Sequence, residues 1–286
     1  MPATIWINGT FHARDTAVIS VYDHGLLYGD GVFEGMRTYG GKVFRLDEHL
    51  DRLWASAKAI ALEIPYTRDE IVAATNEGVR RAGFESSYLR HVVTRGAGSL
   101  GLDVRRARDP QVIIICDELT MFPAEKLAEG LVMVTAGTPI PHREALSPRV
   151  KSLNYLAHVM AKYEGTLAGA DEVLMLDPAG WVCEGSGQNL FVVTRGVLRT
   201  PPASAGILKG VTRDAVLELA HAAGISVREE ILNRYDVYTA DEVFLTGTAS
   251  ELVPVRQVDG RTIGAGRPGP ITGQLLTAFH ELVRRG

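Results

Sequence analysis

The chain of 286 residues contains few cysteines and no strong excess of charge of either sign. Its two cysteines, Cys116 and Cys183, are too far apart for a metal knuckle or a redox pair. Each lies in an apolar, strand-like stretch, which indicates a small buried residue. Thirty basic and 34 acidic residues give a formal net charge of −4. We therefore expect neither a nucleic-acid partner nor a membrane partner, and no metal site.

Long apolar runs are also absent, since no uninterrupted one reaches the roughly 20 residues that span a bilayer. The first residues, MPATIWINGTFHARD, lack the basic start and apolar core of a signal peptide. From these two absences we expect a cytoplasmic protein. Charged residues at 22% and hydrophobic residues at 46% are typical of a soluble globular chain, and its length suits one large domain or two smaller ones.

The first third of the chain alternates short strands with helices. Asn8-Gly9 and Gly40-Gly41 each separate strand-like runs, as in β-hairpins. Asp47 and Thr67 are expected to cap the two helices that follow. The expected strands are 4–7, 10–13, 32–39, 42–45, 87–94 and 111–116, and the expected helices are 48–60 and 68–82.

The same alternation resumes after a connector over residues 120–130. Strands are expected at 131–136, 172–176, 190–193, 226–230 and 242–245, and helices at 156–167, 211–223 and 271–283. This pattern predicts a mixed α/β (α+β) protein with two domains. A small N-terminal two-layer domain would cover residues 1–119, and a larger C-terminal domain residues 131–286.

Lys151 lies in the segment Val150-Lys151-Ser152-Leu153-Asn154-Tyr155, just before an expected helix. A lysine can form a Schiff base with a carbonyl when desolvation or a nearby cation lowers its pKa. Arg149 is such a cation, and Tyr155 could place a phenol near the same carbon. On this segment alone, a solvated loop lysine is the commoner interpretation.

Three other segments suit an anion such as phosphate. Gly210-Val211-Thr212-Arg213 opens a helix, whose first N–H groups attract anions. Thr246-Gly247-Thr248-Ala249-Ser250 is a hydroxyl-rich turn after a strand, and Arg52 supplies a guanidinium. Each has an ordinary alternative: a helix cap, a simple turn or a solvated surface arginine.

Two glycine-rich segments need separate interpretations. Glu184 ends an apolar strand before a glycine turn, where its carboxylate could pair with a protonated ring nitrogen or stay solvated. Gly96-Ala97-Gly98-Ser99-Leu100-Gly101 has the spacing of a dinucleotide-binding loop. No convincing helix follows it and no βαβ unit encloses it, so we interpret it as a flexible loop that could border a substrate pocket.

Taken together, these motifs resemble those of fold-type IV pyridoxal-phosphate (PLP) enzymes, most of all branched-chain amino acid aminotransferases. Five blocks carry the resemblance in the right order: Tyr28-Gly29-Asp30-Gly31-Val32-Phe33-Glu34-Gly35-Met36-Arg37, Val150-Lys151-Ser152-Leu153-Asn154-Tyr155, Glu184-Gly185-Ser186-Gly187-Gln188-Asn189-Leu190-Phe191, Gly210-Val211-Thr212-Arg213 and Thr246-Gly247-Thr248-Ala249. The resemblance implies an N-terminal α/β sandwich, a C-terminal α/β pseudo-barrel and pyridoxal 5′-phosphate as cofactor.

The resemblance also implies roles for individual residues. Lys151 would carry the cofactor as a Schiff base and shuttle the proton, and Tyr155 would hydrogen-bond the phenolate oxygen. Glu184 would pair with the pyridinium nitrogen, and Leu208 would pack on the ring. The groups implied for the phosphate are Arg52, Val211, Thr212, Gly247 and Thr248.

Substrate contacts follow from the same resemblance. The implied residues are Tyr28, Phe33, Gly35, Arg37, Tyr88, Arg90, Gly101, Leu102, Thr248 and Ala249. Tyr88 and Arg90 look like the family's Tyr-x-Arg segment, which places an α-carboxylate. Tyr28 and residues 100–102 would reach a neighbouring subunit, so a homodimer or larger homo-oligomer with shared sites is expected. Gln188, where many relatives carry an acid, and Ser250, where alanine is common, depart from the pattern.

The expected reaction is ping-pong transamination of branched-chain L-amino acids (Leu, Ile, Val) with 2-oxoglutarate. The alternatives of the same fold type are a D-amino acid or (R)-amine transaminase and aminodeoxychorismate lyase. Arg90 in its Tyr-x-Arg setting favours the first. A binding protein that kept the fold without PLP is a third hypothesis, and the joint presence of Lys151, Glu184 and Arg52 speaks against it.

Overall fold

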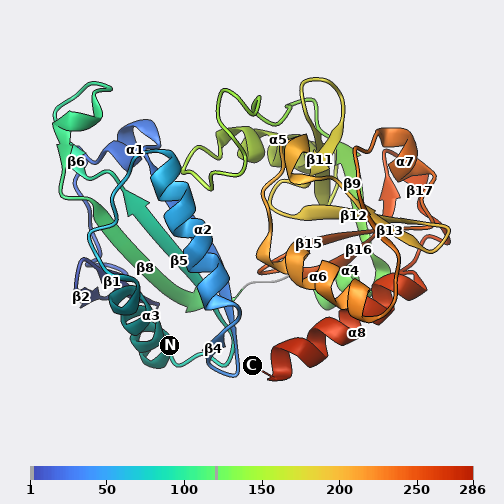
Figure 1. Ribbon diagram of the computed structural model, residues 1–286, viewed down its shortest axis with the longest axis horizontal. Coiled ribbons are helices and arrows are strands. Elements are labelled where there is room, and N and C mark those ends of the chain that lie inside the picture. Colours follow the sequence, from blue (N-terminus) through green and yellow to red (C-terminus); the bar gives the residue numbers. More distant parts are fainter. Residues whose placement is uncertain (1–2, 120–121, 286) are drawn as a thin grey trace. The chain divides into compact units, whose positions relative to one another are not determined.

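The computed structural model describes residues 3–119 and 122–285, which form two compact units (Figure 1). The first unit contains residues up to 119 together with Val150–Asn154, and the second contains 122–149 and 155–285. The sequence-based division places 150–154 in the C-terminal domain, but this segment packs with the first unit. Residues 120 and 121, which begin the expected connector, lie outside the described residues. The rest of the connector includes a short helix, α4 (Ala124–Glu129).

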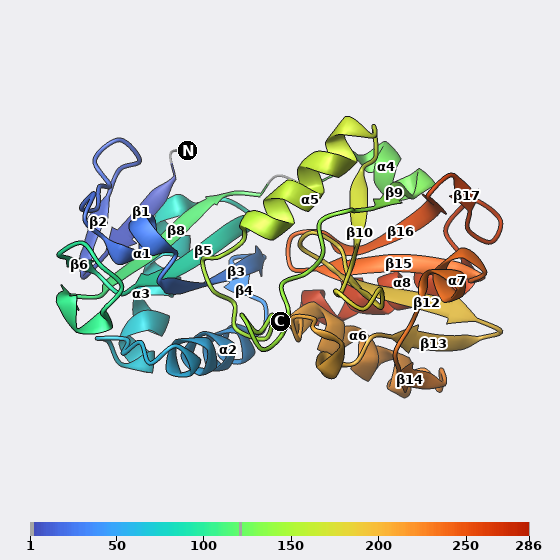
Figure 2. The same ribbon diagram turned by 90° about the horizontal axis from the view of Figure 1, so that it is seen from above.

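The first unit is built on an antiparallel sheet in the order β2-β1-β8-β5-β3-β4. Its strands are β1 (Thr4–Ile7), β2 (Thr10–His12), β3 (Gly31–Tyr39), β4 (Lys42–Val43), β5 (Ser87–Thr94) and β8 (Gln111–Glu118). Helices α2 (Leu46–Ala59) and α3 (Arg68–Ala82) cover one face of this sheet (Figure 2). Alternate side chains of the strands, among them Met36 and Leu89, pack with Leu50 and Leu53 beneath these helices.

The two helix starts differ in how well their caps could be predicted. Thr67 caps α3 in a capping box with Glu70, as expected. The expectation that Asp47 caps α2 is wrong, because this helix begins one residue earlier, at Leu46. Arg45 occupies the cap position with φ of 51° and makes no side-chain cap hydrogen bond. Asp47 lies in the first turn, where its negative charge interacts favourably with the helix dipole.

The loop with dinucleotide-like spacing forms no nucleotide-binding unit. Its residues include β6 (Ala97–Gly98), which pairs with β7 (Ala107–Arg108), and a single 3₁₀ turn at Val104–Arg106 follows. A short helix, α1 (His24–Tyr28), precedes β3 and was not expected from the sequence.

The second unit is built on a sheet that closes on itself. Strands pair in the order β11-β10-β9-β16-β15-β12, and β12 pairs in turn with β11. These strands are β9 (Leu131–Thr135), β10 (Glu172–Leu176), β11 (Val182–Glu184), β12 (Asn189–Thr194), β15 (Glu242–Gly247) and β16 (Glu251–Val258). The sequence indicated β11 only as an apolar strand that ends at Glu184, and it missed β16. The expected sandwich and pseudo-barrel are confirmed.

Helices and further strands surround this closed sheet. Strands β13 (Val197–Thr200) and β14 (Val227–Glu229) extend it from β12, and β17 (Arg261–Thr262) pairs with β16. The helices are α5 (Leu156–Leu167), α6 (Val211–Ala222), α7 (Arg234–Tyr238) and α8 (Pro270–Arg285). Val173 and Met175 of β10 pack with Ala161 of α5, whereas Leu174 points to the opposite, fully buried cluster.

Among the described residues, no helix is both long and apolar enough to cross a membrane. In the same ranges, no group of three or more His, Cys, Asp or Glu side chains is arranged to hold a metal ion. Cys116 and Cys183 are both buried free thiols, as expected.

Leu89, which is fully buried at the centre of the first unit, provides a test of the packing. We expect Leu89→Ala to lower the free energy of unfolding by about 2–5 kcal/mol, because it removes buried methyl groups and leaves a cavity. Urea unfolding followed by the fluorescence of Trp6 and Trp54 measures this loss. Lys58→Ala, at an exposed position of α2, is the control and should change stability by less than about 0.5 kcal/mol.

Candidate active site

The segment Val150–Asn154 lies alongside β3 in the first unit. The Phe33 N–H donates to the Lys151 carbonyl (2.9 Å), and the Leu153 N–H donates to the Gly31 carbonyl (2.9 Å). The Lys151 N–H donates to Ser56 Oγ of α2 (3.2 Å). Since the other edge of β3 pairs with β5, the Lys151 segment occupies the edge that β4 leaves open. The backbone of Lys151 is therefore fixed on both sides, unlike that of a loose surface loop.

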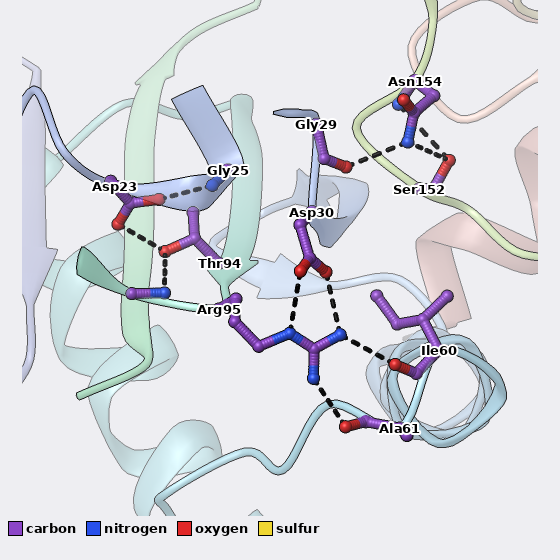
Figure 3. Close-up of polar contacts among 11 residues, drawn as sticks. Asp23, Gly25, Gly29, Asp30, Ile60, Ala61, Thr94, Arg95, Ser152 and Asn154 are labelled. Carbon is purple, nitrogen blue, oxygen red and sulfur yellow. Dashed lines mark hydrogen bonds and ion pairs between the residues drawn. The ribbon is translucent and has the colours of Figure 1, made fainter. Parts of the chain in front are cut away.

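A polar network anchors this segment at its far end (Figure 3). Asn154 Nδ2 donates to the Gly29 carbonyl (2.9 Å). The next residue, Asp30, receives two hydrogen bonds from Arg95, from Nε (2.9 Å) and from Nη2 (2.8 Å). Arg95 also donates to two carbonyl groups just beyond α2, at 2.6 and 2.8 Å. The end of α2, the turn before β3 and the Lys151 segment are thus connected through hydrogen bonds.

The helix α1 places Tyr28 beside the 96–101 loop. Asp23 caps α1 through the Gly25 N–H (2.7 Å) and accepts a hydrogen bond from the Thr94 hydroxyl (2.7 Å) (Figure 3). The Tyr28 hydroxyl accepts from the Gly101 N–H (2.9 Å). Two residues expected at the substrate site, Tyr28 and Gly101, are therefore in contact. Leu102, expected there as well, is 82% exposed.

Alternation along β3 and β5 turns one set of side chains away from α2 and α3. This set consists of Phe33, Gly35, Arg37, Tyr88 and Arg90. Lys151 Nζ and the Arg90 guanidinium carbon each lie 4.5 Å from the centroid of the Phe33 ring. Arg90 Nη2 donates to the Tyr88 hydroxyl (3.1 Å). A Cβ at Gly35 would come within 2.3 Å of that hydroxyl, so a larger residue there would displace the Tyr88 ring from its present position.

Arg37 belongs to this face but lies farther along β3. Its guanidinium carbon is 4.5 Å from the centroid of the Tyr39 ring, and its Nε donates to Ser86 Oγ (3.4 Å). The structure therefore brings together Lys151, Phe33, Gly35, Tyr88 and Arg90, while the contacts described for Arg37 are with other residues.

The next residue of β3 after Phe33, Glu34, points to the opposite face and is fully buried. Arg52, the expected phosphate ligand, donates to both Glu34 oxygens, from Nε and Nη2, at 2.7 Å each. His49 Nδ1 lies 2.8 Å from Glu34 Oε2. Burial alone would raise the pKa of Glu34, but Arg52 and His49 hold it well below its usual range. Sequence reasoning gave Glu34 and His49 no role.

In the second unit, the Glu184 carboxylate is held by hydrogen bonds from a side chain of β12 and from the backbone of the 207–210 segment. Its Oε2 accepts from Asn189 Nδ2 (3.0 Å) and from the Leu208 N–H (3.1 Å). Asn189 Nδ2 also donates to the Leu208 carbonyl (2.8 Å). Glu184 is therefore a buried, oriented carboxylate rather than a solvated turn residue, and Leu208, expected at the cofactor ring, lies beside it.

His158 links Tyr155 to this carboxylate. The Tyr155 and His158 rings are stacked with centroids 4.5 Å apart, and His158 Nε2 lies 4.0 Å from Glu184 Oε1. Neither His158 nor Asn189 was assigned a role from the sequence. Asn189 had a usable signal, because it follows the glycine turn and pairs with Glu184 across the hairpin. His158 had none, because it occupies one helix position among many.

The expected phosphate groups that belong to the second unit lie near the same end of its closed sheet. Asn189 pairs with Thr246 of β15, and a Cβ at Gly210, the residue before α6, would come within 2.1 Å of Asn189 Oδ1. The helix α6 begins at Val211 with no side-chain cap, so Thr212 does not cap it. Within the described residues, the buried hydroxyls of Thr246 and Ser250 have no hydrogen-bond partner.

These features of the second unit fit a phosphorylated aromatic heterocycle. An uncapped helix N-terminus and buried hydroxyls without partners suit an anion. A carboxylate fixed by two donors suits a protonated ring nitrogen. The turn with Gly247, Thr248 and Ala249 belongs to this end, since a Cβ at Gly247 would lie 3.2 Å from the Gln188 side chain of the neighbouring turn.

Comparisons with known proteins agree with the resemblance. Residues 31–258 match the family Amino-transferase class IV. Over 284 residues, the chain is 41% identical to the branched-chain-amino-acid aminotransferase of Pseudomonas aeruginosa, and the match covers 98% of this chain and 92% of that protein. The resemblance drawn from the five sequence blocks is confirmed.

Solved structures show the same fold. The branched-chain amino acid aminotransferase of Escherichia coli has a TM-score of 0.94 and 36% identity, covering 99% of this chain and 95% of that one. The enzyme of Thermoproteus uzoniensis with norvaline has a TM-score of 0.91 and 37% identity, covering 98% and 94%. The enzyme of Thermobaculum terrenum in its PLP form has a TM-score of 0.90 and 32% identity, covering 99% and 94%.

The buried polar cluster beside Glu34 predicts a pH dependence of stability. Burial lowers the pKa of His91, which pairs with Glu34 across β3 and β5, from 6.5 to about 3. Between these values the unfolded chain binds a proton that the folded chain does not. Stability should therefore be greatest above pH 6.5 and fall, by up to about 1.4 kcal/mol per pH unit, as the pH drops.

Urea unfolding at about pH 7 and about pH 5, on either side of the ordinary histidine pKa, measures this dependence. We expect His91→Gln to lose less stability between the two pH values than the wild type does. His142→Gln, at an exposed position, is the matched control and should behave as the wild type. Equal losses in His91→Gln and wild type would contradict the assignment.

Proposed function

Because the chain belongs to the class IV aminotransferases, we propose that it transfers the amino group of branched-chain L-amino acids (Leu, Ile and Val) to 2-oxoglutarate, with pyridoxal 5′-phosphate as cofactor. One observation carries the proposal: Lys151 Nζ and the Arg90 guanidinium contact the same Phe33 ring, each 4.5 Å from its centroid. A substrate carboxylate bound by Arg90 would hold its α-carbon within reach of the lysine amine.

The proposed chemistry divides labour between cofactor and protein. Bound PLP supplies an electron sink for charge that develops at the substrate α-carbon. Lys151 supplies the amine that binds the cofactor aldehyde and, in its neutral form, the general base for the α-proton. Its backbone hydrogen bonds to β3 and α2 restrict where that amine can move. The ping-pong order would follow because the bound cofactor holds the amino group between the two half-reactions, and Lys151 would regain the cofactor aldehyde only after the 2-oxo acid acceptor has taken that group.

We assign the remaining cofactor contacts to the residues that the resemblance identified. Glu184 would keep the ring nitrogen protonated, and its bonds from Asn189 and Leu208 orient the carboxylate for this role. Tyr155 would donate to the phenolate oxygen, and Leu208 would pack on the ring. The groups assigned to the phosphate are Arg52, Val211, Thr212, Gly247 and Thr248.

The proposed amino acid specificity has two supports. The Tyr88–Arg90 pair offers a phenol and a guanidinium for an α-carboxylate, and Phe33 supplies an apolar wall beside it. Relatives of this fold have been crystallised with a phosphopyridoxyl-L-glutamate adduct and with norvaline, which agrees with glutamate and aliphatic amino acids as the exchanging pair. The cytoplasmic location stays a prediction from the sequence.

A half-reaction screen tests the proposal. The PLP form has a visible absorbance band, and we expect L-leucine and L-glutamate to bleach it, whereas D-alanine and (R)-1-phenylethylamine should not. Lys151→Ala should lose the band that borohydride reduces in the wild type, because the covalent link is gone. Bleaching by D-alanine but not by L-leucine would instead identify a D-amino acid transaminase, and bleaching by the (R)-amine an amine transaminase.

We also propose that the enzyme is a homodimer or larger homo-oligomer. Apolar side chains of α5 are exposed at helical spacing: Leu156, Val159, Met160, Tyr163 and Leu167. In the first unit, Leu100 and Leu102 are exposed as well, at 62% and 82%. Apolar surface of this extent on one helix face is typical of an interface between subunits.

Light scattering after size-exclusion chromatography tests this assembly. We expect Met160→Glu to shift the protein towards monomer, because a buried unpaired charge opposes association. Tyr235→Glu, at an exposed position of α7, is the control and should leave the mass unchanged. A wild-type protein that elutes as a monomer at micromolar concentration would contradict the proposal.

A further inference from the structure

From the buried cluster behind β3, we infer that Glu34 and His49 are positioning residues, which set the orientation of Arg52 towards the cofactor phosphate. This inference rests on the proposed function, which assigns Arg52 to the phosphate. Glu34 is fully buried, and the side chain of Arg52 is 13% exposed. The two form a bidentate pair with both N–O distances at 2.7 Å.

The bidentate geometry fixes the plane of the guanidinium. Of its five N–H donors, one on Nε and one on Nη2 bind the two Glu34 oxygens, so rotation about the terminal bond of the side chain is blocked. The remaining donors point away from Glu34 in directions that the pairing sets. A long arginine without such a partner would lose considerable rotamer freedom on binding an anion. Pairing with Glu34 removes that freedom before the phosphate arrives.

His49 fixes the carboxylate in turn. His49 and Arg52 are three residues apart on α2 and so lie on the same helix face. The His49 ring nitrogen Nδ1 is 2.8 Å from Glu34 Oε2, the oxygen that Arg52 Nη2 also binds. Since an ionised carboxylate only accepts hydrogen bonds, Nδ1 carries the proton. Burial lowers the pKa of His49 and thereby favours its neutral form.

The charge balance of the cluster distinguishes orientation from simple attraction. Glu34 neutralises Arg52, so a purely electrostatic view predicts that removing the Glu34 charge would strengthen phosphate binding. If Glu34 instead orients Arg52, its replacement by glutamine should weaken phosphate binding. The glutamine amide would turn a donor group towards the guanidinium or accept only one of its hydrogen bonds. The facing groups are His91, across the strand pair, and Lys151, whose charge acts on His49. All of them are retained in a Glu34 variant.

Orientation and simple electrostatic attraction can be distinguished by measuring how the full-length protein binds PLP and pyridoxal, which lacks the phosphate. The dissociation constant of pyridoxal divided by that of PLP reports the contribution of the phosphate. General damage to the fold weakens the binding of both ligands alike and leaves this ratio unchanged. We expect Arg52→Ala to reduce this ratio roughly tenfold or more, as the loss of a charge-assisted contact does. Glu34→Gln should reduce it nearly as much, and the double variant no further than Arg52→Ala alone.

Two additional variants cover the case in which Glu34→Gln fails to fold. Glu34→Asp keeps the charge but draws the carboxylate back by one methylene, so it should also lower the ratio. His49→Gln should lower it less, because the Glu34–Arg52 pair remains. A wild-type ratio in Glu34→Asp and Glu34→Gln, with a reduced ratio in Arg52→Ala, overturns this inference alone. An unchanged ratio in Arg52→Ala overturns the phosphate assignment itself, and the inference with it.

Discussion

The pleat of β3 is the constraint on which the first unit depends. Because successive side chains of a strand point to opposite faces, Phe33 and Glu34 serve two different groups of residues. Phe33 contacts Lys151 and Arg90 on one face, and Glu34 binds Arg52 and His49 on the other. The Phe33 N–H also donates to the Lys151 carbonyl. A register shift of one residue would exchange the two faces and separate every one of these contacts.

The second unit applies a comparable constraint through its hairpin and closed sheet. Glu184 and Asn189 are opposite each other on β11 and β12, and Asn189 is opposite Thr246 on β15. This row brings a carboxylate, an amide and a buried hydroxyl to one end of the sheet. Leu208 joins the row through both its N–H and its carbonyl. Because the sheet is closed, these strands have no free edge at which their register could shift, which favours a fixed geometry around the Glu184 carboxylate.

Much of the fold could be predicted because its signals are local. The helix Leu156–Leu167 and the strand Glu172–Leu176 have the expected bounds, and Thr67 caps α3 through residues within three positions of it. The start of α2 could not be predicted, because Arg45 adopts a left-handed φ that only the surrounding structure stabilises. The start of the three-residue strand β11 could not be predicted for a similar reason: the strand is too short to show alternation and depends on its neighbours for pairing.

The candidate site was predicted less evenly. The family resemblance pointed to Lys151, Glu184 and Arg52, but not to the side chains that hold them. Glu34 is 18 residues from Arg52 along the chain, and this contact exists only because α2 packs on β3. Arg37 lies in one of the five sequence blocks, but the block did not reveal that its guanidinium contacts Tyr39 and Ser86. Sequence patterns name chemical groups, whereas their supporting partners follow from tertiary packing.

The brief return of the chain to the first unit at 150–154 has a consequence for dividing this protein into modules. A fragment ending at residue 119 would lack the partners of the Phe33 N–H and the Gly31 carbonyl, and the part of the β3 edge that β4 leaves open would face solvent. A fragment beginning at residue 122 would contain Lys151 but would lack β3, the strand along which its segment lies. Lys151 therefore lies between two stretches of sequence that build the second unit, while its backbone is held by the first, so its position depends on both parts of the chain.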